Sequence, residues 1–158
     1  MAPSKGEIER KWLVEDSPDL TKYKGAEIVQ GYLTISPKGD EVRVRQKGEA
    51  FFETVKTGTG LERGEVEIEL TKKQFKKLWP ATRGRRLEKV RYTLKERGRK
   101  IEFDIYQKGL AGLKVVEVEF KSRKQASAFK SPPWFGREVT RKDEYKNANL
   151  AARKTAIH

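Results

Sequence analysis

The chain has 158 residues, of which 36 are basic and 23 acidic, so its formal net charge at neutral pH is +13. This length is enough for one domain with a substantial core, and we expect a single domain over 1–158. Cysteine is absent and His158 is the only histidine, which excludes disulfides and thiol nucleophiles and argues against histidine triads and multi-histidine metal sites.

Alternation of polar and apolar residues dominates the chain and predicts eight strands. The expected ranges are 6–14, 28–36, 40–47, 50–57, 63–70, 86–96, 99–107 and 113–121. Several connections are hairpin-short and rich in glycine, so the sheet should be largely antiparallel.

Capping residues and proline stops predict fewer helical segments. They are a helix between Thr71 and Pro80, a helix between Ser122 and Pro132, a short turn at Ser17-Pro18, and a last short helix or docked tail over 143–153.

The charged residues of the predicted strands share one face of each strand. Arg43 and Arg45 oppose Val42 and Val44, and similar patterns recur on the other strands. Acidic pairs with this spacing are Glu7/Glu9, Glu65/Glu67, Glu102/Asp104 and Glu117/Glu119, and basic pairs are Arg43/Arg45 and Lys89/Arg91. One interpretation is an ordinary solvated face. The other is a curled sheet with the helices outside and the charged face lining an interior.

A charged interior would suit a metal-bound polyphosphate. Carboxylates two residues apart can converge on one hard cation such as Mg²⁺, Mn²⁺ or Ca²⁺, while arginines and lysines hold phosphate oxygens. The net charge alone favours nucleic acid, but the carboxylate pairs would repel a nucleic-acid backbone, so we regard a nucleic-acid partner as unlikely.

The N-terminus has no apolar stretch like that of a signal peptide, and no segment reaches the roughly 20 apolar residues that span a bilayer. We therefore expect a cytoplasmic protein without a membrane partner. Its expected oligomeric state is a monomer or a homodimer.

The chain opens with the charged motif Glu7-Ile8-Glu9-Arg10-Lys11. Further short motifs follow in order over nearly the whole chain: Gln30-Gly31-Tyr32, Val42-Arg43-Val44-Arg45, Thr54-Val55-Lys56, Glu65-Val66-Glu67, Glu88-Lys89-Val90-Arg91-Tyr92, Glu102-Phe103-Asp104, Gly109-Leu110-Ala111-Gly112-Leu113, Val116-Glu117-Val118-Glu119 and Lys146-Asn147-Ala148-Asn149-Leu150-Ala151. In this order the motifs resemble those of the CYTH domains, or triphosphate tunnel metalloenzymes, and the opening one is similar to that family's ExExK signature. The short chain looks most like the compact bacterial members.

The resemblance implies a mainly β, α+β fold: a closed eight-stranded antiparallel tunnel barrel with a few short helices packed outside. It also implies hydrolysis or cyclisation of triphosphates with a divalent metal, Mg²⁺ or Mn²⁺. Family counterparts make Glu7, Glu9, Glu117 and Glu119 the first metal-ligand candidates. Glu65, Glu67 and Asp104 form a second group.

The basic residues of the same motifs are the candidate holders of the small-molecule triphosphate, because a triphosphate carries about four negative charges and its transfer depends on positioning and neutralisation. They are Lys11, Arg43, Arg45, Lys56, Lys89 and Arg91. For catalysis, Lys11 and Tyr32 either form a dyad with Lys11 as base or orient the substrate while the metal activates water.

The function expected from the sequence is hydrolysis of inorganic tripolyphosphate to pyrophosphate and phosphate. The alternatives are a class IV-type adenylyl cyclase, a thiamine triphosphatase, and a non-catalytic module that binds polyphosphate or nucleic acid.

Overall fold

The structure is a computed structural model that describes residues 8–58 and 63–153. This part contains eight strands: β1 Ile8–Leu13, β2 Ala26–Ile35, β3 Glu41–Lys47, β4 Ala50–Thr57, β5 Gly64–Leu70, β6 Arg86–Glu96, β7 Arg99–Tyr106 and β8 Lys114–Phe120. Each corresponds to a predicted strand, and β4 and β6 have the predicted bounds.

All eight strands belong to one antiparallel sheet in the order β1-β8-β7-β6-β2-β3-β4-β5. The turn between β6 and β7 shows how the sequence sets this pairing. Arg97 and Gly98 have φ angles of 52° and 74°. A two-residue hairpin with positive φ at both positions matches the twist of antiparallel strands, so the expected antiparallel sheet is confirmed.

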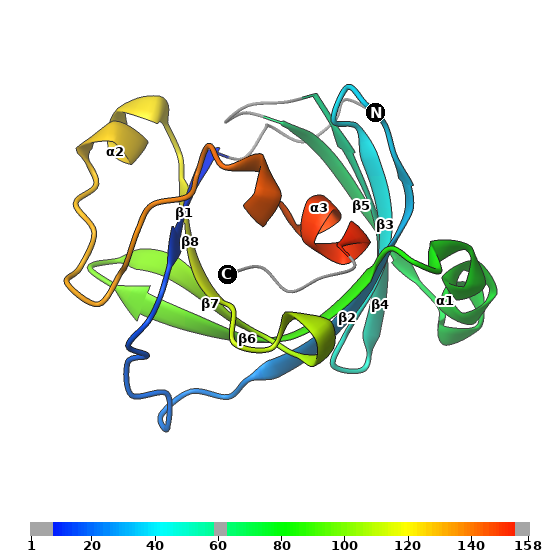
Figure 1. The fold of residues 1–158 in the computed structure, drawn as a ribbon, viewed down its shortest axis with the longest axis horizontal. Helices are drawn as coiled ribbons and strands as arrows, with labels where there is room; N and C mark the ends of the chain where they lie inside the picture. Colours follow the sequence, from blue (N-terminus) through cyan, green and yellow to red (C-terminus); the bar gives the residue numbers. More distant parts are fainter. Residues whose placement is uncertain (1–7, 59–62, 154–158) are drawn as a thin grey trace.

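The sheet curls strongly but does not close, which corrects the prediction of a closed barrel (Figure 1). β1 and β5 stand at the two ends of the sheet order and are not paired with each other. The outer edge of β1 pairs instead with a later segment, where the Leu13 amide donates to the Arg137 carbonyl at 2.9 Å and the Val139 amide to the Lys11 carbonyl at 2.8 Å. Since both edges of β1 are occupied, it cannot also pair with β5.

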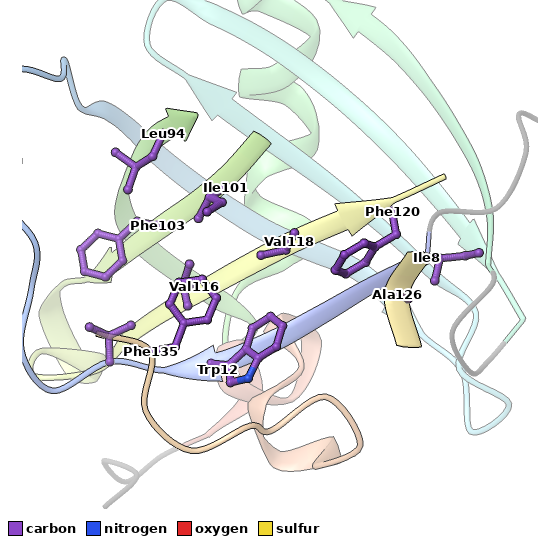
Figure 2. Close-up of a cluster of buried hydrophobic side chains, with 11 residues drawn as sticks. Ile8, Trp12, Leu94, Ile101, Phe103, Val116, Val118, Phe120, Ala126 and Phe135 are labelled. Atoms are coloured by element: carbon purple, nitrogen blue, oxygen red, sulfur yellow. The ribbon is translucent and has the colours of Figure 1, made fainter. Parts of the chain in front are cut away.

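The convex face of the sheet is apolar, as the curled interpretation requires. Over β1, β8 and β7 it carries Trp12, Phe103 and Val116, which are at most 2% exposed. Phe135 covers them from the loop that precedes residues 137–139, the segment paired with β1 (Figure 2). A second cluster on β3, β4 and β5 is built on Phe51. These two parts of the core therefore lie outside the curl.

Two helices cover this convex face as predicted. α1 (Lys72–Leu78) starts at Thr71 in a reciprocal capping box with Gln74, continues into the 3₁₀ helix η1 (Trp79–Thr82), and inserts Phe75 against β4. α2 (Arg123–Ala128) starts at Ser122 and packs on β1 and β8. Residues 17–20 form no helix, so the turn expected at Ser17-Pro18 is wrong.

The C-terminal segment departs from the prediction that the helices pack outside. The 3₁₀ helix η3 (Asp143–Tyr145) leads into α3 (Asn147–Ala152), which lies inside the curl of the sheet (Figure 1). Ala148, Leu150 and Ala151 pack there against an apolar end of the concave face that includes Tyr32 and Leu87, with the short η2 (Lys108–Leu110) beside it. In the described residues, no helix is long and apolar enough to cross a membrane.

Gly31 on β2 lies at a close approach between the sheet and η1. A Cβ at this position would lie 2.6 Å from Thr82 Cβ. Thr82 cannot move aside freely, because it is fully buried and its hydroxyl donates to the Trp79 carbonyl at 2.7 Å. The glycine thus allows η1 to pack on β2.

We predict that Gly31→Ala lowers the free energy of unfolding by about 1–3 kcal/mol, because the added methyl overpacks a rigid contact. Gly109→Ala is the control, since a Cβ there meets nothing within 4 Å. Denaturant unfolding measures both, and equal stability of the two variants would show that η1 can shift.

Candidate active site

A charged pocket of about 270 Å³ occupies the concave face. Its lining within the described residues contains nine basic and seven acidic side chains and no aromatic one. The lining residues are Glu9, Lys11, Glu41, Arg43, Arg45, Lys47, Lys56, Arg63, Glu65, Glu67, Arg91, Lys100, Glu102, Glu117, Glu119, Lys146 and Asn147.

Strand register brings these side chains together. Residues two apart on β3 and β5 project into the pocket, and pairing aligns Glu41, Lys56 and Glu65 in one row across β3, β4 and β5. On the other side of the curl, pairing of β1 with β8 places Glu9 opposite Glu119 and Lys11 opposite Glu117. Most of the predicted charged residues therefore line one pocket.

Glu9 and Glu117 form a close carboxylate pair. The carboxylate of Glu117, and then burial, raise the pKa of Glu9 to about 7. Burial alone would raise the pKa of Glu117 as well, but the cations of Lys11 and Arg91 lower it to about 2. Lys11 Nζ lies 3.2 Å from Glu117 Oε1. At neutral pH the two carboxylates thus carry more negative charge than this part of the site stabilises.

This pair is the part of the pocket whose chemistry fits a hard cation, because oxygen ligands of this kind hold Mg²⁺ and Mn²⁺. Glu119 adds a third carboxylate in register with Glu9. Within 8–58 and 63–153 no group of three acidic or histidine side chains is already arranged around one metal position. Glu7, the other expected ligand of the opening motif, lies outside the described residues.

Three arginines, Arg43 and Arg45 of β3 and Arg91 of β6, lie together in the pocket lining and form an arginine wall. Burial, and then the neighbouring Arg43 and Arg91, lower the pKa of Arg45 to about 10. The Nε atoms of Arg43 and Arg45 are buried and have no hydrogen-bond partner. A buried N–H without an acceptor is costly, so these two Nε donors lack the anionic oxygens that guanidinium groups normally bind.

Arg91 is held by an ion-pair network between β6 and β7. Its Nε and Nη2 donate to the two oxygens of Asp104 at 2.7 and 2.8 Å, and its Nη1 donates to Glu102 at 2.8 Å. Lys89 Nζ lies 2.8 Å from the same Asp104. Burial alone would raise the pKa of Asp104, but Lys89 and Arg91 hold it well below its ordinary value.

Lys89, Tyr32 and Asp104 do not line the pocket, although they lie on the same concave face, where they are buried. Lys89 and Asp104 are 1% exposed, and Tyr32 is fully buried. Burial lowers the pKa of Lys89 to about 8, although Asp104 opposes the effect. The Tyr32 hydroxyl accepts a hydrogen bond from Gln30 Nε2 at 2.9 Å, and burial raises its pKa.

Lys11 and Tyr32 were expected as a possible dyad, and the structure gives no hydrogen bond between these two described residues. Lys11 Nζ donates instead to the Tyr145 carbonyl at 3.1 Å. Burial alone would lower the pKa of Lys11, but Glu117 and Glu9 raise it above its ordinary value. Lys11 is therefore a fixed cation at neutral pH.

On β4 and β5, the expected residues Lys56, Glu65 and Glu67 line the pocket. Glu67 accepts from the Thr54 hydroxyl at 2.8 Å and lies 3.6 Å from Arg45 Nη2. Glu67 therefore contacts both the Thr54 hydroxyl and the arginine wall.

Sequence reasoning missed several lining residues. Glu41 and Lys47 continue the inward alternation of β3, and Lys100 that of β7, so strand periodicity could have identified them. Arg63 reaches the pocket from outside the strands and no local pattern marks it, whereas Lys146 begins the expected tail motif but was not among the expected site residues.

We predict that Glu9→Gln raises the melting temperature of the metal-free protein at pH 8 and changes it little at pH 4. The pKa of Glu9 is about 7 in the folded protein and ordinarily 4.5, so its ionisation destabilises the fold as pH rises between these values. The control is Glu69→Gln, at an exposed position of β5 outside the pocket. Thermal scans across pH test this, and a loss of stability at pH 8 would give Glu9 a structural role.

No family model matches the chain. Two similar proteins are described as inorganic triphosphatases. One, from Nitrosomonas europaea, is 48% identical over 146 residues, which cover 92% of this chain and 96% of that protein. The other, from Acetivibrio thermocellus, is 34% identical and covers 91% of this chain and 92% of its own length.

Solved structures agree with this relationship. A crystal structure of an inorganic triphosphatase is 45% identical, has a TM-score of 0.73, and covers 94% of this chain and 96% of that one. A protein from Pyrococcus horikoshii, 17% identical with a TM-score of 0.57 over 77% of this chain and 83% of its own, shares the fold. With close relatives matched over nearly its whole length, the chain belongs to the family of these inorganic triphosphatases.

Proposed function

We propose that the protein hydrolyses inorganic tripolyphosphate to pyrophosphate and phosphate in the concave pocket, as a compact bacterial member of the CYTH, or triphosphate tunnel metalloenzyme, family. Its similarity to inorganic triphosphatases supports this reaction. The observation that carries the proposal is the arginine wall, where Arg43 and Arg45 present buried Nε donors without acceptors. Phosphate oxygens supply such acceptors.

The substrate would lie between the arginine wall and the carboxylate pair. Arg43, Arg45 and Lys56 hold the phosphates. Lys11, which is ion-paired with Glu117, lies at the carboxylate side of the substrate. Arg91 is already bonded to Asp104 and Glu102, so it presents a fixed positive edge. Fixed donors stabilise charge that shifts during phosphoryl transfer without reorganising at that moment.

We propose Mg²⁺ or Mn²⁺ as the cofactor, held by Glu9, Glu117 and Glu119 together with Glu7. When bound, such a cation neutralises phosphate charge and polarises phosphoryl oxygens as a Lewis acid. Glu65 and Glu67 line the same pocket and form the second group of candidates. Both oxygens of Asp104 accept from Arg91, so we assign Asp104 to positioning.

For the proton acceptor we propose Lys89 in preference to Lys11. A base should have a pKa near the working pH, and burial brings the pKa of Lys89 to about 8, whereas that of Lys11 is raised. Because Lys89 is buried and does not line the pocket, water must carry the proton to it. Lys11 and Tyr32 would orient the substrate and its surroundings.

The alternative substrates each contain an organic group. An adenylyl cyclase or a thiamine triphosphatase must also hold an adenine or a thiamine moiety, and the described lining offers no aromatic side chain for stacking. A nucleic-acid module is disfavoured by the seven carboxylates in the lining, which repel a phosphate backbone.

The test is incubation with tripolyphosphate, ATP or thiamine triphosphate, each with Mg²⁺, with Mn²⁺ or with excess chelator. We expect equal amounts of pyrophosphate and orthophosphate from tripolyphosphate, and none after chelation. Cyclic AMP from ATP would establish the cyclase instead. Faster turnover of thiamine triphosphate, or turnover that survives chelation, would contradict the proposed substrate or cofactor.

We predict that Arg43→Ala lowers kcat/KM for tripolyphosphate about 100-fold, as expected when one preorganised donor to the transition state is removed. Lys22→Ala is the matched control, because Lys22 is an exposed cation on the loop between β1 and β2. Steady-state kinetics measure both variants. Unchanged kinetics for Arg43→Ala would place the substrate elsewhere.

We predict that kcat/KM of the wild type rises with pH through about 8, where Lys89 loses its proton, and that Lys89→Arg removes this rise. Arginine keeps a cation beside Asp104 but cannot be deprotonated. The pH dependence of kcat/KM for both proteins is the measurement. The same rise in the variant would exclude Lys89 as the base.

A further inference from the structure

A second pocket lies at the other end of α3 and shares no lining residue with the catalytic pocket. Asn147, at the start of α3, lines the catalytic pocket, whereas Leu150 and Arg153, at its end, line the second one. The second pocket has a volume of about 520 Å³. Its lining residues are Val29, Trp79, Arg86, Leu87, Glu88, Gln107, Lys108, Gly109, Leu110, Leu150 and Arg153.

This lining combines an apolar surface with several cations. Val29, Leu87, Leu110 and Leu150 supply the apolar part, with the indole of Trp79 beside them. Such a surface buries a ring well, and it differs from the catalytic pocket, whose lining is almost entirely charged. The expected ligand is therefore amphipathic, with a ring at one end and negative charge at the other.

Arg86 is held in one orientation at this pocket. Its Nε donates to the Thr82 hydroxyl and its Nη2 to the Trp79 carbonyl, both at 2.9 Å, and its guanidinium lies 4.4 Å from the centroid of the Trp79 ring. Trp79 also stacks on Phe75, with ring centroids 5.2 Å apart. A guanidinium fixed in this way offers a planar cation on which an aromatic ring can stack, at little further loss of conformational freedom.

Lys108 occupies a backbone conformation that favours glycine. Its φ is 57°, and Arg97 is the other non-glycine residue with positive φ in the described part of the chain. Such a conformation costs stability for a residue with a side chain, and glycine would relieve it. The Lys108 side chain lines the pocket, so the residue that bears this backbone strain also places a cation at the pocket surface.

We propose that this pocket binds a nucleoside monophosphate, with the base on Arg86 and the phosphate at Lys108. Glu88 is the acidic side chain in the lining, and a carboxylate in such a position accepts hydrogen bonds from ribose hydroxyls. A bare phosphate would leave both the apolar surface and this carboxylate without a partner. The site is separate from the proposed triphosphatase pocket and does not depend on that function.

The test is calorimetric titration of the full chain with AMP, which contains no phosphoanhydride bond, so the heat reports binding alone. Orthophosphate and adenosine are the two partial ligands. We expect AMP to bind at least tenfold more tightly than either, because each partial ligand lacks one of the two contacts. Excess tripolyphosphate should not displace AMP, and Arg43→Ala, which alters the catalytic pocket, should bind AMP like the wild type.

Lys108→Gly is the decisive variant, because glycine suits the positive φ and the fold should be retained. We expect it to weaken AMP binding about tenfold through loss of one charge-assisted contact. Arg97→Gly is the matched control: it relieves the same backbone conformation on the β6–β7 turn, outside the pocket, and should leave the affinity unchanged.

Four outcomes would overturn the proposal: no heat with AMP at millimolar concentration, equal affinity for AMP and orthophosphate, displacement of AMP by tripolyphosphate, or equal weakening by Lys108→Gly and Arg97→Gly. Each of these is independent of tripolyphosphate turnover, so failure here leaves the proposed function standing.

Discussion

The arrangement of the molecule depends on which face of the curled sheet is apolar. The convex face carries the clusters built on Trp12 and Phe51 and is covered by α2 and α1, so the charged side chains must share the inside of the curl. Fixed charges in a confined space interact more strongly than on an open surface, because less water separates them. The same alternation that builds an ordinary two-faced sheet therefore produces, once the sheet curls, a concentrated site for charged ligands.

The two sides of this site need ligands of opposite charge: one has hydrogen-bond donors without acceptors, and the other has carboxylates that repel each other. At the arginine wall, the Nε atoms of Arg43 and Arg45 lack acceptors. At the carboxylate side, the charge of Glu117 raises the pKa of Glu9 to about 7. Mutual pairing cannot correct both, because the strands hold the two groups apart, and Arg91 is already committed to Asp104 and Glu102. A polyphosphate bound to a divalent cation offers anionic oxygens to the arginines and positive charge to the carboxylates. Because a simple anion or a simple metal ion would satisfy only one of these two groups, the site favours the metal-bound polyphosphate.

The sequence predicted the strands and the inward charges well because both depend on local alternation, as on β3, where Arg43 and Arg45 oppose Val42 and Val44. Closure was predicted wrongly because it depends on a long-range competition: residues around Arg137, which show no strand pattern, occupy the edge of β1 that closure would need. The burial of Lys89 could not be predicted either, since its place in the strand alternation is the same as that of Arg91. Only tertiary packing distinguishes the two residues: it buries Lys89 and so lowers the pKa of its amine, whereas Arg91 lines the pocket.

The position of α3 adds a constraint that alternation could not reveal. Ala148 and Ala151 are small enough for the helix to approach the concave face, and with Leu150 they fill one end of the curl against Tyr32, Leu87, Tyr106 and Val115. Tyr106 fixes the start of α3, since its hydroxyl donates to Asn147 Oδ1. A charged groove open at both ends could bind a long polyanion along its length, but a groove filled at one end by apolar side chains can accept only a chain that ends inside it. A short polyphosphate meets this requirement, and a nucleic-acid duplex, whose backbone continues in both directions, does not.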